Sequence, residues 1–261
     1  MKILFIGDVV GSPGREVIKT LVTPLKQELG IDFVIANAEN ASGGSGITSK
    51  VAAELFASGV DVLTSGDHIW KKIEIFELIN QEERILRPLN FPSGAPGRGA
   101  KVFTARNGIK VGVININGRV FMEALECPFR AAYKAAEELA GETKIIIVDV
   151  HAEATSEKIA LGWYLDGKVS AIFGTHTHIQ TADEKILPQG TAYITDVGMT
   201  GPYDSVIGRR VEDVLTRFLS SIPVRFQVAQ ENVQLHGALV EIDEATGKAR
   251  SILRIQRKLN G

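Results

Sequence analysis

Short apolar runs rich in valine and isoleucine alternate, up to Thr175, with stretches of helical spacing. Runs of this kind, without polar interruptions, are typical of strands that are buried on both faces. Helical spacing predicts helices over 49–59, 72–80 and 128–141, the last of which begins with Pro128 and ends at Gly141. The alternation indicates an α/β sheet with helices on its faces. The predicted strands are KILFI, FVIANA, VDVLTS, KVGVININ, KIIIVDV and VSAIFGT.

The C-terminal part of the chain has a different pattern. Residues 223–258 are typical of antiparallel strands closed by a turn near Gly247, so the sheet should be mixed. The segment 91–101 is expected to be a surface loop. The sequence contains no internal repeat and no long Pro/Gly/Ser linker, which favours a single domain over residues 1–261.

Composition narrows the class of protein. A chain of 261 residues with 44% hydrophobic residues can fill a large core. A formal net charge of -2 lacks the basic excess of a duplex-binding surface, so duplex nucleic acid is not an expected partner. Cys127 is the only cysteine, which excludes an intramolecular disulfide and favours a reducing compartment. The N-terminal apolar run is too short for a signal segment or a membrane span, so we expect a cytoplasmic protein without a membrane partner.

Polar side chains follow the predicted strands at the points where the strands end. Strands of a common direction bring such ends to one edge of a sheet, where ligands bind in open α/β sheets. Four of the five histidines are among these residues. The residues are Asp8, Glu39, Asn40, Asp67, His68, His151, His176 and His178.

His176 and His178 are separated by one threonine directly after an apolar run. Residues two apart on a strand point to the same face, so both imidazoles should face one point. Taken alone, the pair could also be two unrelated loop residues. Asp8 alone could cap a helix that starts near Pro13, Glu39 alone could pair with a lysine or arginine, and His151 alone could be a hydrogen-bonded core residue. The fifth histidine, at position 236, is expected to be structural because it lies in an alternating strand.

Together these residues supply three carboxylates, one amide and four imidazoles to one edge. The carboxylates would repel one another unless cations were bound there. Oxygen and imidazole donors without thiolate suit manganese, iron or zinc, and the number of donors exceeds what one tetrahedral ion needs. The sequence therefore predicts a site for two metal ions.

The order of these motifs resembles that of the calcineurin-like metallophosphoesterases. The segments ILFIGDVVGSPGR, HAEATSEK, LGWY, GTHTHIQTAD and TAYITDVGMTGPYDSVIG are similar to the YmdB-like branch of that superfamily over nearly the whole chain. This resemblance implies a four-layer α/β/β/α sandwich with two mixed sheets, a dinuclear iron or manganese centre (zinc being the alternative), and phosphodiesterase activity on 2',3'-cyclic nucleotides.

The resemblance also implies a role for each residue. Asp8 and His178 resemble ligands of the first metal, and Glu39 resembles the carboxylate that bridges both. His68 matches the proton donor. Asp67 departs from the branch, which normally has asparagine at this position, and so puts the charge and identity of the second metal in question. The residues that match ligands of the second metal are Asn40, Asp67, His151 and His176.

The implied reaction opens a cyclic diester such as 2',3'-cAMP to a 3'-nucleotide. Two ions about 3.5–4 Å apart can hold a bridging hydroxide in line with the phosphorus, while His68 protonates the leaving oxygen. The substrate would be a small cyclic nucleotide or another phosphodiester.

Two other functions compete with this interpretation. An amidohydrolase also uses an H-x-H motif, but normally after its first strand. A regulatory protein could keep the metals for stability and act through partner binding, with incidental hydrolysis. The segment 195–208 could be a surface turn or a loop that borders the nucleotide pocket. Members of the family tend to self-associate, so a homo-oligomer is compatible with the resemblance.

Overall fold

The computed structural model describes residues 1–259, which form two mixed β-sheets. In the first sheet the order is β2-β11-β12-β1-β3-β4, and β13 pairs with the other edge of β12. Strands β1, β3 and β4 are parallel, whereas β12 runs antiparallel to β1. The strands are β1 (Lys2–Ile6), β2 (Asp8–Val9), β3 (Phe33–Asn37), β4 (Val62–Thr64), β11 (Met199–Pro202), β12 (Val233–Ile242) and β13 (Ala249–Lys258).

The second sheet has the order β5-β6-β7-β8-β10-β9. Strands β6, β7, β8 and β10 are parallel to one another. Strand β5 pairs antiparallel with β6 at one edge, and β9 pairs antiparallel with β10 at the other. The strands are β5 (Ala100–Thr104), β6 (Lys110–Asn117), β7 (Ile146–His151), β8 (Ala171–Thr175), β9 (Lys185–Ile186) and β10 (Ala192–Ile194).

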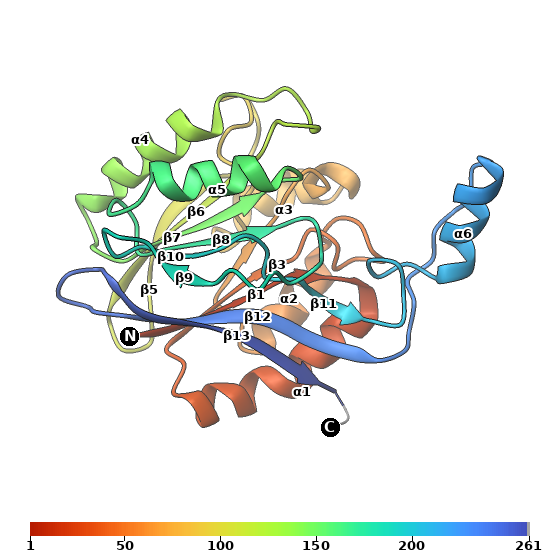
Figure 1. The fold of residues 1–261 in the computed structure, drawn as a ribbon, viewed down its shortest axis with the longest axis horizontal. Helices are drawn as coiled ribbons and strands as arrows, with labels where there is room; N and C mark the ends of the chain where they lie inside the picture. The colour runs from red at the N-terminus through yellow and green to blue at the C-terminus, as the bar shows by residue number, and fades with distance from the viewer. Residues whose placement is uncertain (260–261) are drawn as a thin grey trace.

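The two sheets face each other, and helices cover their outer faces (Figure 1). Helices α1 (Gly11–Leu29), α2 (Ser49–Ala57) and α3 (Ile75–Gln81) pack on the first sheet, together with the short 3-10 helix η1 (Ile69–Lys71). Helices α4 (Pro128–Ala140) and α5 (Thr155–Tyr164) pack on the second sheet. The expected four-layer α/β/β/α sandwich is therefore confirmed. Helix α6 (Val211–Ser220) stands away from these layers.

Alternation along each strand explains why the strand sequences are continuously apolar. On β1, Ile3 and Phe5 point into the core between the sheets, whereas Leu4 and Ile6 point toward the helices. Phe5 stacks on Phe173 of β8, with their ring centroids 4.8 Å apart, and so joins the two sheets. Because both faces are buried, both faces are mostly apolar. The expectation of one domain over residues 1–261 stays a prediction, which these shared core layers support.

The predicted helices are present with slightly different bounds. Helix α1 begins at Gly11, two residues before the expected start, and ends before Gly30, whose φ of 66° closes the helix in the left-handed conformation. Helices α5 and α6 were not predicted. The surface loop expected at 91–101 is largely correct, although β5 already begins at Ala100.

The predicted site residues gather where the carboxyl ends of both sheets meet, rather than at the edge of one sheet. Asp8, Glu39 and Asp67 follow β1, β3 and β4 of the first sheet. His151 ends β7 of the second sheet, and His176 follows β8. The face-to-face packing of the two sheets brings these ends together.

Candidate metal centre

Four side chains converge at this junction. One ligand atom from each of Glu39, Asp67, His151 and His176 lies within 4.8 Å of those of the other three. The Nε2 atom of His151 lies 3.2 Å from Oε2 of Glu39 and 3.3 Å from Oδ1 of Asp67. The Nδ1 atom of His176 lies 3.6 Å from Oδ1 of Asp67. Two carboxylates and two imidazoles in this arrangement could hold one metal ion.

Gly66 permits this close approach of strands β4 and β7. A Cβ atom at position 66 would lie 2.1 Å from Cδ2 of His151 and 2.4 Å from Oε2 of Glu39. Both distances are far below a normal contact. Any side chain at position 66 would therefore displace His151 and Glu39 from their present positions.

His151 is held by hydrogen bonds to buried groups behind it. Its Nδ1 lies 2.9 Å from Oγ1 of Thr175, which in turn donates to Oδ1 of Asp149. Thr64 and Asn37 donate to the other oxygen of Asp149. These contacts occupy Nδ1 of His151, so only Nε2 is available to the cluster. Metal-binding histidines are commonly oriented in this way by a hydrogen bond to their other ring nitrogen.

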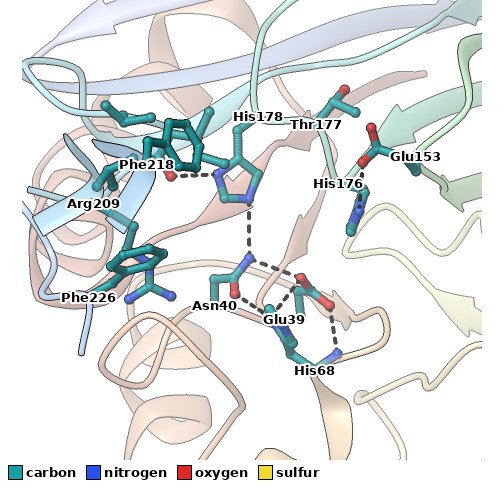
Figure 2. A pocket seen from close by; sticks show the side chains of 13 residues that line it. Glu39, Asn40, His68, Glu153, His176, Thr177, His178, Arg209, Phe218 and Phe226 are labelled. Atoms are coloured by element: carbon teal, nitrogen blue, oxygen red, sulfur yellow. Dashed lines mark hydrogen bonds and ion pairs between the residues drawn. The ribbon is translucent and has the colours of Figure 1, made fainter. Parts of the chain in front are cut away.

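The two histidines of the H-x-H motif do not lie on a strand, so the strand argument for their common direction was wrong. His176 has a φ of 93° and His178 a φ of 65°, because both residues lie in a turn after β8 rather than on the strand. His176 directs Nδ1 toward His151, at 3.0 Å from its Nε2, and places its own Nε2 3.2 Å from Oε2 of Glu153. His178 lies above Asn40 in the view of Figure 2, whereas His176 lies beside Glu153.

His178, Asp8 and Asn40 form a second group beside Glu39. The Nδ1 atom of His178 lies 3.0 Å from the carbonyl oxygen of Ile207, and its Nε2 lies 3.3 Å from Nδ2 of Asn40 and 3.9 Å from Oδ1 of Asp8. Asn40 also donates to Oε1 of Glu39. Glu39 therefore lies between the two groups. Asp8 does not cap α1, whose N-cap is Val10; instead it accepts the backbone N–H of His176.

A buried ion pair anchors the turn that carries both histidines. The Nζ atom of Lys158 donates to Oδ2 of Asp196 at 2.9 Å, and both side chains are fully buried. The same carboxylate accepts from the backbone N–H and the hydroxyl of Thr177. Asp196 lies in the 195–208 segment, which is thus more than a surface turn. Thr177 lies between the two histidines, and its hydrogen bonds to Asp196 hold the turn in place. These bonds offset the conformational cost of the positive φ angles of His176 and His178.

The electrostatics of the cluster fit bound cations. Burial raises the pKa of Asp8 to about 7. Burial alone would raise the pKa of Glu39 too, but the charge and hydrogen bond of His151 hold it well below its usual range. Burial would lower the pKa of His151, yet the charge of Glu39 and the hydrogen bonds to both carboxylates raise it well above its usual range. The shifts of Glu39 and His151 both mean that positive charge next to these carboxylates is favourable.

Two further observations support the fit. Oδ1 of Asp8 is buried and has no hydrogen-bond partner within residues 1–259. Buried carboxylate oxygens without partners are costly unless a cation is bound. Burial and the charge of His151 lower the pKa of His176 to about 4, and burial lowers the pKa of His178, so both rings are neutral and can act as ligands.

His68 lies beside the cluster and faces the cavity above it. Its Nδ1 lies 2.8 Å from Oδ1 of Asn40 and 3.4 Å from Oε1 of Glu39. The hydrogen bond to Glu39 is the main cause that raises the pKa of His68, and the charges of Glu39 and Asp67 act in the same direction. His68 therefore retains a proton more readily near neutral pH than an isolated histidine does.

A cavity of about 420 Å³ opens over these residues. One side of it is polar and includes His68, Glu153 and the two histidines of the turn. The other side comes from the segment 206–226, of which only residues 206–208 belong to the loop that the sequence offered as a border of the pocket. Its lining residues are Val206, Ile207, Arg209, Val214, Phe218 and Phe226.

The sequence did not indicate several residues that contact the metal-binding histidines, because neither their residue types nor their positions distinguish them. Glu153 belongs to the quoted HAEATSEK motif, but only the fold shows that it reaches His176. Asp149 and Thr175 lie within apolar strand sequences. His236 is in β12, away from the cluster, and stacks on Tyr203 with ring centroids 4.2 Å apart, in keeping with a structural role.

The model of the YmdB-like protein family matches residues 4–255. The chain belongs to the YmdB-like family. A relative in Bacillus subtilis (strain 168), named 2',3'-cyclic-nucleotide 2'-phosphodiesterase, is 51% identical over 255 residues, which cover 98% of this chain and 96% of the relative.

Two solved structures have the same fold as this YmdB-like chain. A hypothetical protein from Thermus thermophilus superposes with a TM-score of 0.92 at 40% identity and covers 99% of each chain. A structure described as a novel phosphatase from Mycoplasma pneumoniae superposes with a TM-score of 0.91 at 36% identity, covering 99% of this chain and 93% of that one. The expected family, fold and enzyme class, a phosphoesterase, are thereby confirmed.

None of the helices formed by residues 1–259 has the length and apolar character that crossing a bilayer requires.

Proposed function

We propose that this YmdB-like protein is a dinuclear metal-dependent phosphodiesterase that hydrolyses 2',3'-cyclic nucleotides, such as 2',3'-cAMP, to 3'-nucleotides. The convergence of Glu39, Asp67, His151 and His176 next to an open cavity, which Glu39 and His176 line, is the observation that carries this proposal. The activity in the name of the Bacillus subtilis relative, at 51% identity, supports the substrate class.

In this proposal the seven predicted ligands hold two ions. Asp8 and His178 would hold the first, Glu39 would be shared by both, and the remaining four would hold the second. Asn40 lies beside Glu39 on the side of His178, so its amide adjoins the carboxylate that both ions would share. Carboxylate and imidazole donors favour iron or manganese, and zinc is the alternative. The four ligands of the second ion are Asn40, Asp67, His151 and His176.

When bound, the two ions supply Lewis-acid activation of water near neutral pH and neutralise charge on the phosphoryl oxygens. The side chains of the chain supply the rest. Hydrogen bonds of His151 and His178, and the contact of His176 with Glu153, fix which nitrogen of each ring faces the cluster. His68 protonates the leaving oxygen, since it faces the cavity and its pKa is raised by Glu39.

A cytoplasmic location is part of the same proposal, in line with the single free cysteine, Cys127. The favoured partner is a small cyclic nucleotide or another phosphodiester, and duplex nucleic acid is not expected. Whether the protein forms a homo-oligomer stays an open prediction.

Turnover of 2',3'-cAMP by metal-loaded protein tests the proposal, with product analysis by chromatography. We expect 3'-AMP as the product, and we expect His68→Ala to lose most of the turnover while retaining both metals. Formation of 2'-AMP would contradict the regiochemistry. If hydrolysis were absent or unaffected by His68→Ala, the protein would instead be a metal-binding regulator with incidental activity.

A further inference from the structure

The wall of the cavity opposite the metal cluster carries one cation and two aromatic rings that the proposed chemistry does not use. In the view of Figure 2, Arg209, Phe218 and Phe226 lie on one side of His178, and His176 and Glu153 lie on the other. The side chain of Phe218 is 75% exposed and that of Phe226 is 39% exposed. The two rings therefore pack only partly against the protein and are available to a ligand.

Arg209 is half-buried, and within residues 1–259 its guanidinium forms no ion pair with a carboxylate. One Nη atom donates to the carbonyl oxygen of Gly44. Burial lowers the pKa of Arg209, although an arginine stays charged under all ordinary conditions. A partly desolvated positive charge without an anionic partner, facing a cavity, is suited to an anionic ligand.

Gly44 holds Arg209 in this place. It has a φ of +85°, and a Cβ atom there would lie 2.3 Å from Nη1 of Arg209. The absence of a side chain lets the guanidinium rest against the backbone of the loop that follows Glu39 and Asn40. The position of Arg209 therefore depends on the same loop that carries two of the predicted metal ligands.

We infer that Arg209, Phe218 and Phe226 form the nucleotide subsite of this cavity, in which the guanidinium binds a phosphate oxygen and the two rings hold the base. This inference rests on the proposed function and specifies where that function obtains its selectivity. A cavity of about 420 Å³ has the size of small-molecule sites, which lie at roughly 300–1,000 Å³. Aromatic side chains stack on any nucleobase, because every base has a flat π face.

The experiment compares two substrates that share the cyclic phosphate and differ in the base. One is 2',3'-cAMP, and the other is the abasic ribose 2',3'-cyclic phosphate. Arg209→Met should raise KM about tenfold or more for both, as expected for loss of a hydrogen bond to a charged group. Phe218→Ala and Phe226→Ala should raise KM about 5–150-fold for 2',3'-cAMP alone, the range that stacking on one base gives.

Matched controls lie next to the tested residues. Arg210→Met removes an adjacent exposed cation, and Leu219→Ala removes an adjacent side chain that is 85% exposed and does not line the cavity. Both should leave KM unchanged for either substrate. Gly44→Ala should reproduce the effect of Arg209→Met, because the new Cβ would displace the guanidinium. Metal content and circular dichroism verify that each variant is folded and loaded.

Binding of 3'-AMP, measured by calorimetry on the metal-loaded protein, separates this inference from the proposed function. If the wild type hydrolyses 2',3'-cAMP but Arg209→Met and the two phenylalanine variants behave like the controls, the subsite is wrong and the function stands. If the wild type does not turn over 2',3'-cAMP yet binds 3'-AMP, and these variants lose that binding, the subsite stands and the function is wrong. An equal effect of the phenylalanine variants on both substrates would overturn the assignment of the base.

Discussion

The two walls of the cavity are built in opposite ways. The metal wall comes from strand ends, and two of its side chains are almost inaccessible: Glu39 is 1% exposed and His151 is 0% exposed. Each of its histidines is held by a further protein group. The opposite wall comes from the 206–226 segment, which includes helix α6, and its two aromatic side chains, Phe218 and Phe226, are exposed.

The difference separates two tasks. Ions and a reacting phosphate require donors that do not move, which only a packed and hydrogen-bonded framework provides. Selection of a base needs only an accessible apolar surface, and such a surface tolerates change. Substitutions on the metal wall should therefore affect turnover much more than substitutions on the opposite wall.

The largest effect is expected for ligands of the metal wall. Glu39→Ala, Asp8→Ala and His178→Ala should each abolish turnover, mainly because metal is lost. Elemental analysis alongside turnover checks this expectation, with His68→Ala as the control that keeps both ions. Full metal content in Glu39→Ala would show that Glu39 does not bridge.

Loss of the proton donor should come next. His68→Ala is expected to lower kcat by about 10²–10⁴-fold for 2',3'-cAMP, whose leaving oxygen needs a proton. An activated aryl diester should lose much less, because its leaving group is a weak base. Since the pKa of His68 is raised, wild-type activity should persist above the usual histidine pKa and decline as the pH rises further. The pH–rate profile of His68→Ala should lack this decline; an unchanged kcat would exclude the donor role.

The buried pair behind the H-x-H turn should have an intermediate effect. Asp196→Asn leaves the charge of Lys158 buried and unpaired and weakens the anchor of Thr177. We expect about a 10–100-fold loss of activity or metal affinity, the usual effect of outer-shell partners. Urea unfolding should show a destabilisation of about 3–5 kcal/mol. The double variant Lys158→Met/Asp196→Asn should recover stability; if Asp196→Asn equalled the wild type in both measurements, the anchor would be irrelevant.

The smallest effect is expected at Asp67, where the chain departs from the asparagine of its branch. Burial would raise the pKa of Asp67, but the hydrogen bond from His151 and the charges of His151 and His68 outweigh it and lower the pKa. Asp67 is therefore ionised at neutral pH and points at the cluster. A carboxylate ligand holds its cation more tightly than an amide but makes it a weaker Lewis acid.

In pH–rate profiles, the acidic limb of Asp67→Asn should consequently lie at lower pH than that of the wild type. Metal retention, measured by competition with a chelator, should be weaker in the variant. Superimposable profiles together with equal retention would mean that the extra charge has no electrostatic consequence.

Much of the metal wall could be predicted from the chain alone. Strands that are buried on both faces must be continuously apolar, so a charged or imidazole side chain directly after such a strand marks its end. This is why Asp8, Glu39, Asp67 and His151 could be placed on one edge before any contact was known. The opposite wall gave no such signal, because Arg209 and Phe218 are ordinary residues of a loop and an amphipathic helix.

Sequence by itself determined the α/β alternation, the donors of the cluster and the resemblance to the family, since these depend on local pattern and residue type. Tertiary structure alone decided that the strand ends belong to two facing sheets, because the sequence does not specify which strands are neighbours. It also decided that His176 and His178 face different groups. Strand alternation predicts a common direction, but two positive φ angles place both residues in a turn, where His176 contacts His151 and His178 contacts Asn40.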